Sequence, residues 1–259
     1  MHSLLNRTDA TILGLLLFIG MIAMVVLGRR CSKRWDRENK EVTGGVGSLL
    51  AALFALAGLI LAFTFGMSGT RLEKIRTIVE QEANDIGTAI LRADLYPDSV
   101  REGFRTDFKD YLEAVIRFYE NASNRTLAYK AKEDAGKAGE KLWARAARQS
   151  KRPDMFISSN QMVPALNSMF DTATSREVIL KSKVPDLVIY MLFICVLATC
   201  FIGGFTSDAI HMKSWIIVIG FALISSLVVY TTIDLARPMR GVIKESAGQE
   251  AIIELRKMF

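Results

Sequence analysis

The sequence has few of the side chains on which most enzymes depend. Histidine and cysteine are scarce: the chain contains only His2, His211, Cys31, Cys195 and Cys200. None of them lies in the long polar stretch between residues 71 and 184. No Ser/His/Asp set, metal cluster or glycine-rich phosphate loop can be assembled there, so we expect neither an enzyme nor a bound metal or cofactor. The odd cysteine count also gives no disulfide framework.

Signals for β-strands and for nucleic-acid binding are also missing. Alternating apolar and polar runs are few, and no Asn-Gly or Asp-Gly hairpin turn occurs. The net charge is +6, but 33 basic residues are dispersed among 27 acidic ones. This distribution favours a solvated helical surface with basic anchors at membrane edges, and we expect no nucleic-acid partner.

Long apolar runs are what the sequence does have. Those long enough to cross a bilayer as a helix, with no charge away from their ends, are Thr11–Gly28, Val46–Met67, Asp186–Phe205 and Ser214–Leu235. The first run is followed by Arg29 and Arg30 rather than by a small-residue cleavage site, so we interpret it as a span. The pattern predicts an all-α integral membrane protein with two N-terminal and two C-terminal transmembrane helices, embedded in membrane lipid.

The stretch between the second and third spans predicts a helical polar domain. Apolar residues at helical spacing continue from Arg71 without a breaker to Pro97, so the second span should continue as a long helix. Asp98 is the expected N-cap of the next helix, and Arg152-Pro153-Asp154 is an expected break. Further helices are expected over about residues 98–121, 127–149 and 162–183.

The expected domains follow from these elements. They are an N-terminal hairpin over residues 1–70, a polar domain over 71–184, and a C-terminal hairpin with its tail over 185–259. The spans lie at 11–28, 46–67, 186–205 and 214–235.

Small residues recur along the second span at steps of three or four. They are Gly47, Ala51, Ala55, Gly58, Ala62, Gly66 and Gly69. On a helix they form one narrow stripe that lets another backbone approach closely. Two interpretations stay open: packing against a span of the same chain, or an intersubunit or pore-side role.

Polar residues on either side of the polar domain could form a network. Glu82, Asp85 and Arg92 share one face of the long helix, and their expected counterparts before the third span are Asn167, Asp171 and Arg176. Unpaired charge at a helix interface is costly, so the interpretation is a structural network rather than an ion site.

No carboxylate, histidine or basic group lies at membrane depth, which argues against an ion-coupled transporter. Asp234 lies at the end of the fourth span beside Arg237, where we expect an ion pair at the membrane edge. A channel gated by an apolar constriction needs no charge within the membrane, because dewetting can close it.

The basic residues do not fix the orientation. The first connector holds six of them, Arg29, Arg30, Lys33, Arg34, Arg37 and Lys40, whereas the span ends on the other face hold ten in total. The total number of basic residues on each face favours a cytoplasmic polar domain, whereas their density in the first connector favours the reverse orientation.

Several motifs resemble an uncharacterised bestrophin-like family of four-span bacterial membrane proteins. They are Ala62-Phe63-Thr64-Phe65, Glu82-Ala83-Asn84-Asp85-Ile86-Gly87, Leu91-Arg92-Ala93-Asp94-Leu95-Tyr96-Pro97, the set Asn167, Asp171 and Arg176, and Asp234-Leu235-Ala236-Arg237-Pro238-Met239-Arg240-Gly241. The resemblance covers almost the whole chain and implies an architecture more than an activity.

The chain is also distantly similar to true bestrophins, which are pentameric anion channels. Their constriction on the second span has apolar and aromatic residues one turn apart before a Thr-Arg pair, and here Leu59 and Phe63 precede Thr70-Arg71. Ala55 stands one turn before Leu59, and no acidic cluster is similar to the calcium clasp of the animal proteins.

This similarity implies a homo-oligomeric, pentameric channel for small anions, with Leu59 and Phe63 lining the pore. It also implies an inner-membrane location with a cytoplasmic polar domain. The alternative is a non-conducting membrane scaffold or sensor whose helical domain binds a partner.

Overall fold

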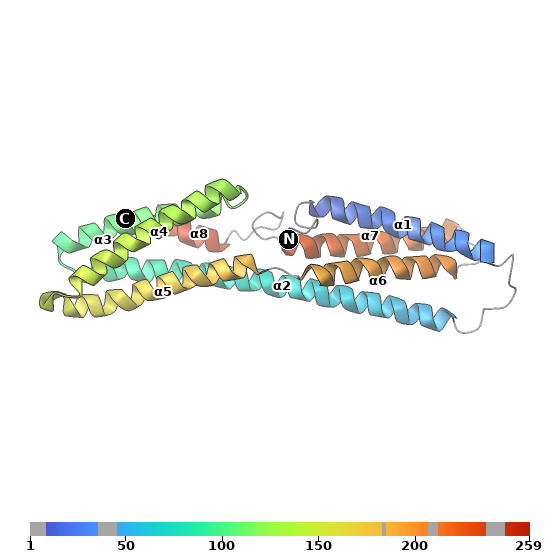
Figure 1. The fold of residues 1–259 in the computed structure, drawn as a ribbon, viewed down its shortest axis with the longest axis horizontal. Helices are drawn as coiled ribbons and strands as arrows, with labels where there is room; N and C mark the ends of the chain where they lie inside the picture. Colours follow the sequence, from blue (N-terminus) through green and yellow to red (C-terminus); the bar gives the residue numbers. More distant parts are fainter. Residues whose placement is uncertain (1–8, 36–45, 183–184, 207–211, 237–246) are drawn as a thin grey trace. The chain divides into compact units, whose positions relative to one another are not determined.

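The structure is a computed structural model that describes residues 9–35, 46–182, 185–206, 212–236 and 247–259 (Figure 1). Within these ranges all regular structure is helical, which confirms the predicted all-α class. In chain order the helices are α1 (Ala10–Trp35), α2 (Val46–Ala93), α3 (Asp98–Glu120), α4 (Arg125–Gln149), η2 (Pro153–Met155), α5 (Phe156–Lys181), α6 (Asp186–Phe205), α7 (Met212–Leu235), α8 (Ala247–Glu254) and η3 (Leu255–Met258).

The chain divides into two compact units. The span unit comprises Met1–Arg71 and Lys183–Arg237, and the polar unit comprises Leu72–Ser182 and Pro238–Phe259. Helix α2 contributes its first part to the span unit and its second part to the polar unit. The last residues, which we had grouped with the C-terminal hairpin, belong instead to the polar unit, because α8 packs there against α3.

Among the residues that the structure describes, four helices are long and apolar enough to cross a membrane, and they contain the four predicted spans. The third span begins and ends where the sequence predicted, at Asp186 and Phe205. The first helix is longer than its apolar run, because α1 continues through the basic residues after Gly28 to Trp35. Basic side chains in a last turn complement the helix dipole, which favours this extension.

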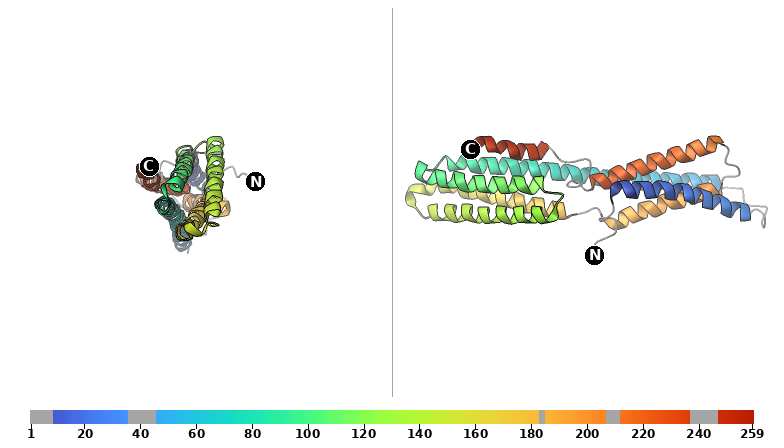
Figure 2. Two further views of the ribbon diagram at one scale, coloured as in Figure 1. Left: turned by 90° about the vertical axis from the view of Figure 1, so that its left-hand side faces the viewer. Right: turned by 90° about the horizontal axis from the view of Figure 1, so that it is seen from above.

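Within the span unit, α1 lies beside both α6 and α7 (Figures 1 and 2). Its contact with α6 depends on two glycines. A Cβ atom added at Gly28 would lie 2.0 Å from the carbonyl oxygen of Phe201. A Cβ atom added at Gly204 would lie 2.1 Å from the carbonyl oxygen of Val25. The backbones of α1 and α6 therefore approach each other closely at these glycines.

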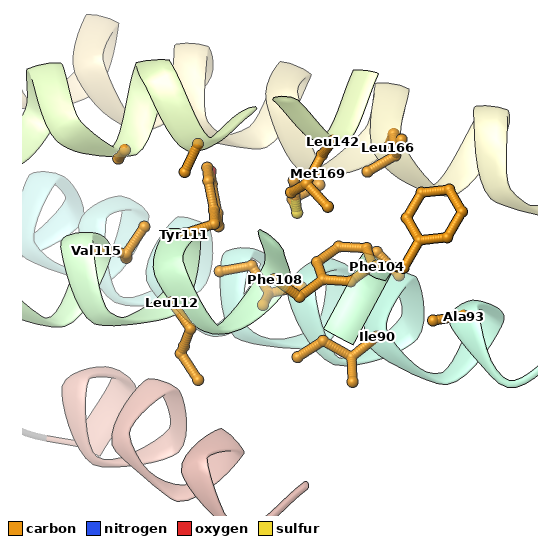
Figure 3. Packing of buried hydrophobic residues seen from close by; sticks show 14 of the residues in the cluster. Ile90, Ala93, Phe104, Phe108, Tyr111, Leu112, Val115, Leu142, Leu166 and Met169 are labelled. Carbon is orange, nitrogen blue, oxygen red and sulfur yellow. The ribbon is translucent and has the colours of Figure 1, made fainter. Parts of the chain in front are cut away.

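The core of the polar unit is built from the apolar faces of α2, α3, α4 and α5 (Figure 3). Phe104, Phe108 and Leu112 follow one another by a helical turn on α3 and are fully buried. Ile90 from α2 and Leu166 from α5 meet the same core. Apolar residues at helical spacing thus form one face on each helix, and these faces pack together as a four-helix core.

Two local predictions require correction, and one helix was missed. Pro97, not Asp98, is the N-cap of α3, and Asp98 is its first helical residue, where its carboxylate still complements the helix dipole. Helix α5 begins at Phe156, six residues earlier than expected, and continues through Pro164. Pro164 lies on an exposed face, where water can satisfy the carbonyl group that loses its helical partner. Helix α8 was not predicted.

Candidate functional site

The first part of α2 is the span least covered by its own chain. Its apolar window is 11% buried, compared with 28% for α1 and 33% for each of α6 and α7. A span that neighbours cover so little must be covered by lipid or by another molecule.

The exposed side of this span carries a stripe that we call the free face. It consists of Ala51, Ala55, Gly58, Leu59, Ala62, Phe63 and Gly66, all of which are exposed. Leu59 is 53% exposed and Phe63 is 66% exposed. A Cβ atom added at Gly58 or Gly66 would meet no heavy atom within 4 Å.

The small residues of the free face therefore pack against no helix of the same chain in the part that the structure describes. Of the two interpretations left open by the sequence, packing within the chain is not what the described structure contains. Gly47 belongs to α2, but the structure does not describe how far it is buried.

The other spans expose a different kind of surface. Leu15, Leu16 and Ile19 on α1 are more than half exposed, as are Ile216 and Ile217 on α7. Large aliphatic side chains suit contact with lipid tails, whereas a Gly/Ala surface suits the close approach of a helix. The free face differs from its neighbours in composition as well as in exposure.

The opposite side of the span carries polar groups near its end. Thr64 and Ser68 are almost fully buried, and the Thr64 hydroxyl donates to the Ile60 carbonyl at 2.7 Å. One turn further, the Arg71 guanidinium donates to the Ala236 carbonyl just beyond α7. Asp234 is also buried, while its expected partner Arg237 lies outside the described residues. Arg71 is therefore part of a contact between α2 and the end of α7.

In the polar unit, Glu82 and Arg176 form a buried ion pair. Arg176 Nη1 lies 2.5 Å from Glu82 Oε1, and the two side chains are 6% and 0% exposed. The Tyr119 hydroxyl donates to Glu82 Oε2 at 2.7 Å. The Arg176 guanidinium also lies over the Phe118 ring, 4.7 Å from its centroid. Each carboxylate oxygen of Glu82 thus has a donor, which is what a buried charge requires.

This environment fixes the charge states of the network. Burial raises the pKa of Tyr119, and the negative charge of Glu82 raises it further, so the phenol remains a donor. Burial alone would lower the pKa of Arg176, but Glu82 and Tyr119 more than compensate and raise it. Arg176 therefore keeps its positive charge, which suits a structural tie between α2 and α5.

Only part of the predicted polar network forms. Asp85 accepts a hydrogen bond from Thr172 at 2.6 Å and another from Gln81 at 2.9 Å. Arg92 is half-buried, and Asn167 and Asp171 are exposed. The side chains of these last three residues make no hydrogen bond or ion pair within the described ranges.

Sequence reasoning missed Tyr119, Phe118 and Thr172. Tyr119 lies on the buried face of α3. A tyrosine on a buried stripe needs a partner for its hydroxyl, and that requirement was the available signal. Among the described residues, no group of three or more His, Cys, Asp or Glu side chains could hold a metal ion.

Comparisons with known proteins agree with this architecture. A family model described as a bestrophin-like domain matches residues 14–246. No curated protein sequence matches the chain.

Solved structures with a similar fold include a bacterial bestrophin homolog from Klebsiella pneumoniae. A variant of it with a tryptophan-to-alanine mutation superposes with a TM-score of 0.68 at 11% identity, covering 99% of this chain and 97% of that one. The structure of that homolog phased with zinc gives 0.65 at 11% identity, with coverages of 94% and 96%. A leucine-to-alanine variant described only as a membrane protein gives 0.59 at 12%, with 93% and 94%. At these identities the likeness is one of fold.

Proposed function

The chain belongs to the bestrophin-like family, and from this premise we propose that it forms a homo-oligomeric, anion-permeable channel in the membrane. Helix α2 lines the pore in this proposal. Leu59 and Phe63, one helical turn apart, form an apolar constriction that closes by dewetting.

The free face of α2 is the observation that carries the proposal. It is a surface of glycine and alanine with two large apolar side chains, and its own chain leaves it uncovered. In an oligomer, the small residues allow α2 helices of neighbouring copies to approach closely, while Leu59 and Phe63 face the space between them. A monomer in lipid gives no reason for a Gly/Ala stripe on its most exposed span.

The proposal of anions and of five copies derives from the similarity to true bestrophins. It is consistent with the free face, which has no carboxylate between Ala51 and Gly66. A ring of carboxylates would attract cations, and this segment offers none.

For orientation we propose that the polar unit is cytoplasmic and that the protein lies in the inner membrane. Cysteine labelling tests this. In a background without native cysteines, Ser123→Cys should resist an impermeant thiol reagent in intact cells, whereas Ser32→Cys should react. The reverse pattern would place the polar unit outside.

Bilayer recording of the purified protein tests conduction. The wild-type protein should give unitary currents that reverse near the chloride equilibrium potential. Phe63→Ala should increase the open probability or the conductance, because it widens the constriction. Leu223→Ala on α7, where the leucine is 59% exposed, is the matched control and should leave the current unchanged.

An assembled oligomer without any current would overturn the channel proposal. It would favour the non-conducting scaffold or sensor. Equal effects of Phe63→Ala and Leu223→Ala would contradict the assignment of the constriction.

A further inference from the structure

The polar unit contains a cavity of about 480 Å³ between α4 and α5, with α3 at its base. Its volume lies within the range of pockets that bind small molecules. Small residues create the space: Ala135, Gly136 and Gly139 from α4 face Ala173 from α5. A Cβ atom at Gly136 would meet nothing within 4 Å, so the wall at this position is open.

Three aromatic side chains line this cavity. Tyr111 comes from α3, Trp143 from α4 and Phe170 from α5. The Tyr111 and Phe170 rings meet edge to face, with centroids 6.5 Å apart and planes at 69°. Trp143 is 42% exposed although it is the largest side chain of α4. Its ring is therefore available to a ligand at the mouth of the cavity.

Tyr111 also leaves a polar group without a partner. The residue is only 4% exposed, and it points from α3 toward α4 (Figure 3). Its hydroxyl makes no hydrogen bond to any described residue. Two other buried tyrosines of the same core, Tyr96 in the turn between α2 and α3 and Tyr119 on α3, both have hydroxyl partners. The hydroxyl oxygen itself is reached from the cavity, and a ligand there can exchange a hydrogen bond with it.

The charges around the cavity favour a cation. Both basic residues of the wall are already paired: Lys132 with Glu177, and Arg176 with Glu82. Glu140 also lines the cavity, and it makes no ion pair within the described part of the chain. Lys137, one turn before it on α4, interacts with this carboxylate only at longer range, so the carboxylate remains available as a counter-charge.

Burial raises the pKa of Tyr111, and the negative charge of Glu82 raises it further. The positive charge of Arg176 lowers this pKa by a smaller amount. The hydroxyl is therefore neutral and can accept a hydrogen bond as well as donate one.

We propose that this cavity binds a small organic ammonium ion between Tyr111, Trp143 and Phe170, with Glu140 as its counter-charge. Aromatic faces attract ammonium groups through their quadrupoles, and the attraction is stronger where water is excluded. The cavity would make the polar unit a ligand-binding domain, and its binding does not depend on conduction by the spans.

Calorimetric titration of the full-length protein in a non-ionic detergent tests the proposal. The probe is benzyltrimethylammonium, compared with benzyl alcohol and benzoate. We expect saturable binding of the ammonium ion, weaker binding of the alcohol and none of benzoate. Glu140→Gln should weaken the ammonium affinity about fivefold, the effect of one unit charge at 4 Å in water, and should leave the alcohol unchanged.

A variant that fills the cavity separates this site from partition into detergent. Gly136→Leu should abolish binding without loss of folding, because leucine is a better helix former and its side chain enters open space. Lys130→Leu, exposed on the same helix and outside the cavity, is the matched control and should bind normally. Absence of saturable binding, a preference for benzoate, or equal binding by these two variants would overturn the proposal.

Discussion

The two parts of α2 differ in how completely their own chain covers them. In the polar unit, Ile75, Val79, Ile86 and Ile90 are all at most 1% exposed. In the span unit, the free face is open along its whole length, and Gly58 has no neighbour for an added Cβ atom. One helix thus completes a core in one unit and leaves a surface uncovered in the other.

The difference shows what a single chain can and cannot stabilise. The polar unit satisfies its apolar faces and its buried charges internally, as the Glu82–Arg176 pair illustrates. The span unit makes a close internal contact at Gly28 and Gly204, whereas the small residues of the free face on α2 pack against no described helix of the same chain. We therefore expect changes in the polar unit to alter the stability of the chain, and changes on the free face to alter assembly.

The largest expected effect is on assembly. Gly58→Leu should convert most of the protein from oligomer to monomer, because a leucine side chain blocks close approach of a second helix. Native mass spectrometry or light scattering measures this against the 28.8 kDa chain. The folding of the chain should be unaffected, since an added Cβ atom enters open space.

Gly220→Leu is the matched control. Gly220 also lies in a span and also has nothing within 4 Å of an added Cβ atom, but its neighbours Ile216 and Ile217 are large and exposed. This variant should assemble normally. Equal behaviour of the two variants would remove the distinction between a helix-contact face and a lipid face.

The next largest effect is on stability of the polar unit. Arg176→Ala should lower the free energy of unfolding by about 3–5 kcal/mol, because it leaves Glu82 buried without a counter-charge. Arg117→Ala removes an exposed ion pair with Asp134 and should cost about 0–1 kcal/mol. Denaturant unfolding compares the two, and similar losses would mean that the Glu82–Arg176 pair is not the structural tie described above.

A smaller effect is expected where α8 docks. An added Cβ atom at Gly248 would lie 2.7 Å from Val79 Cγ1, so Gly248→Ala should weaken docking by about 1–3 kcal/mol through overpacking. Hydrogen exchange at residues 252–258 should then increase. Gly136→Ala has open space instead and should stabilise its helix by about 1 kcal/mol. Unchanged exchange in Gly248→Ala would contradict the close contact.

The smallest effect is a pH dependence of the same docking. The Arg256 guanidinium, bonded to both oxygens of Glu113 at 2.8 Å, lowers the pKa of that carboxyl. A lowered folded-state pKa contributes stability above the unfolded value of about 4.3 and loses it as the pH falls through the folded value. Exchange of the C-terminal segment should therefore increase on acidification below pH 4. Glu113→Gln should remove the rise in exchange below pH 4. An unchanged pH dependence in this variant would mean that a group other than Glu113 causes the rise.

Hydrophobic periodicity was sufficient to predict the helices and the spans. The third span matches to the residue, and the long second helix was expected from the absence of a breaker before Pro97. Helix α8 was not predicted, because eight residues with only Ile252 fully buried give too short a period to recognise.

The candidate sites depended on how helices rotate against one another, which sequence spacing does not contain. Glu82 and Arg176 do meet, but Asn167 and Asp171 lie on the exposed face of the same helix α5. The stripe on α2 could likewise be found from its spacing, whereas the absence of any covering helix could be seen only in three dimensions. The cavity beside Tyr111 is formed by small residues from two different helices, so the sequence alone did not predict it.

Cysteine cross-linking in native membranes tests most directly whether copies of this chain meet on the free face of α2. In a background without Cys31, Cys195 and Cys200, Gly58→Cys should form a ladder of covalent oligomers with a short bifunctional thiol reagent. Gly220→Cys, at a position where an added Cβ atom likewise meets nothing within 4 Å, should remain monomeric. A monomeric Gly58→Cys, or a ladder of equal yield from Gly220→Cys, would contradict the account.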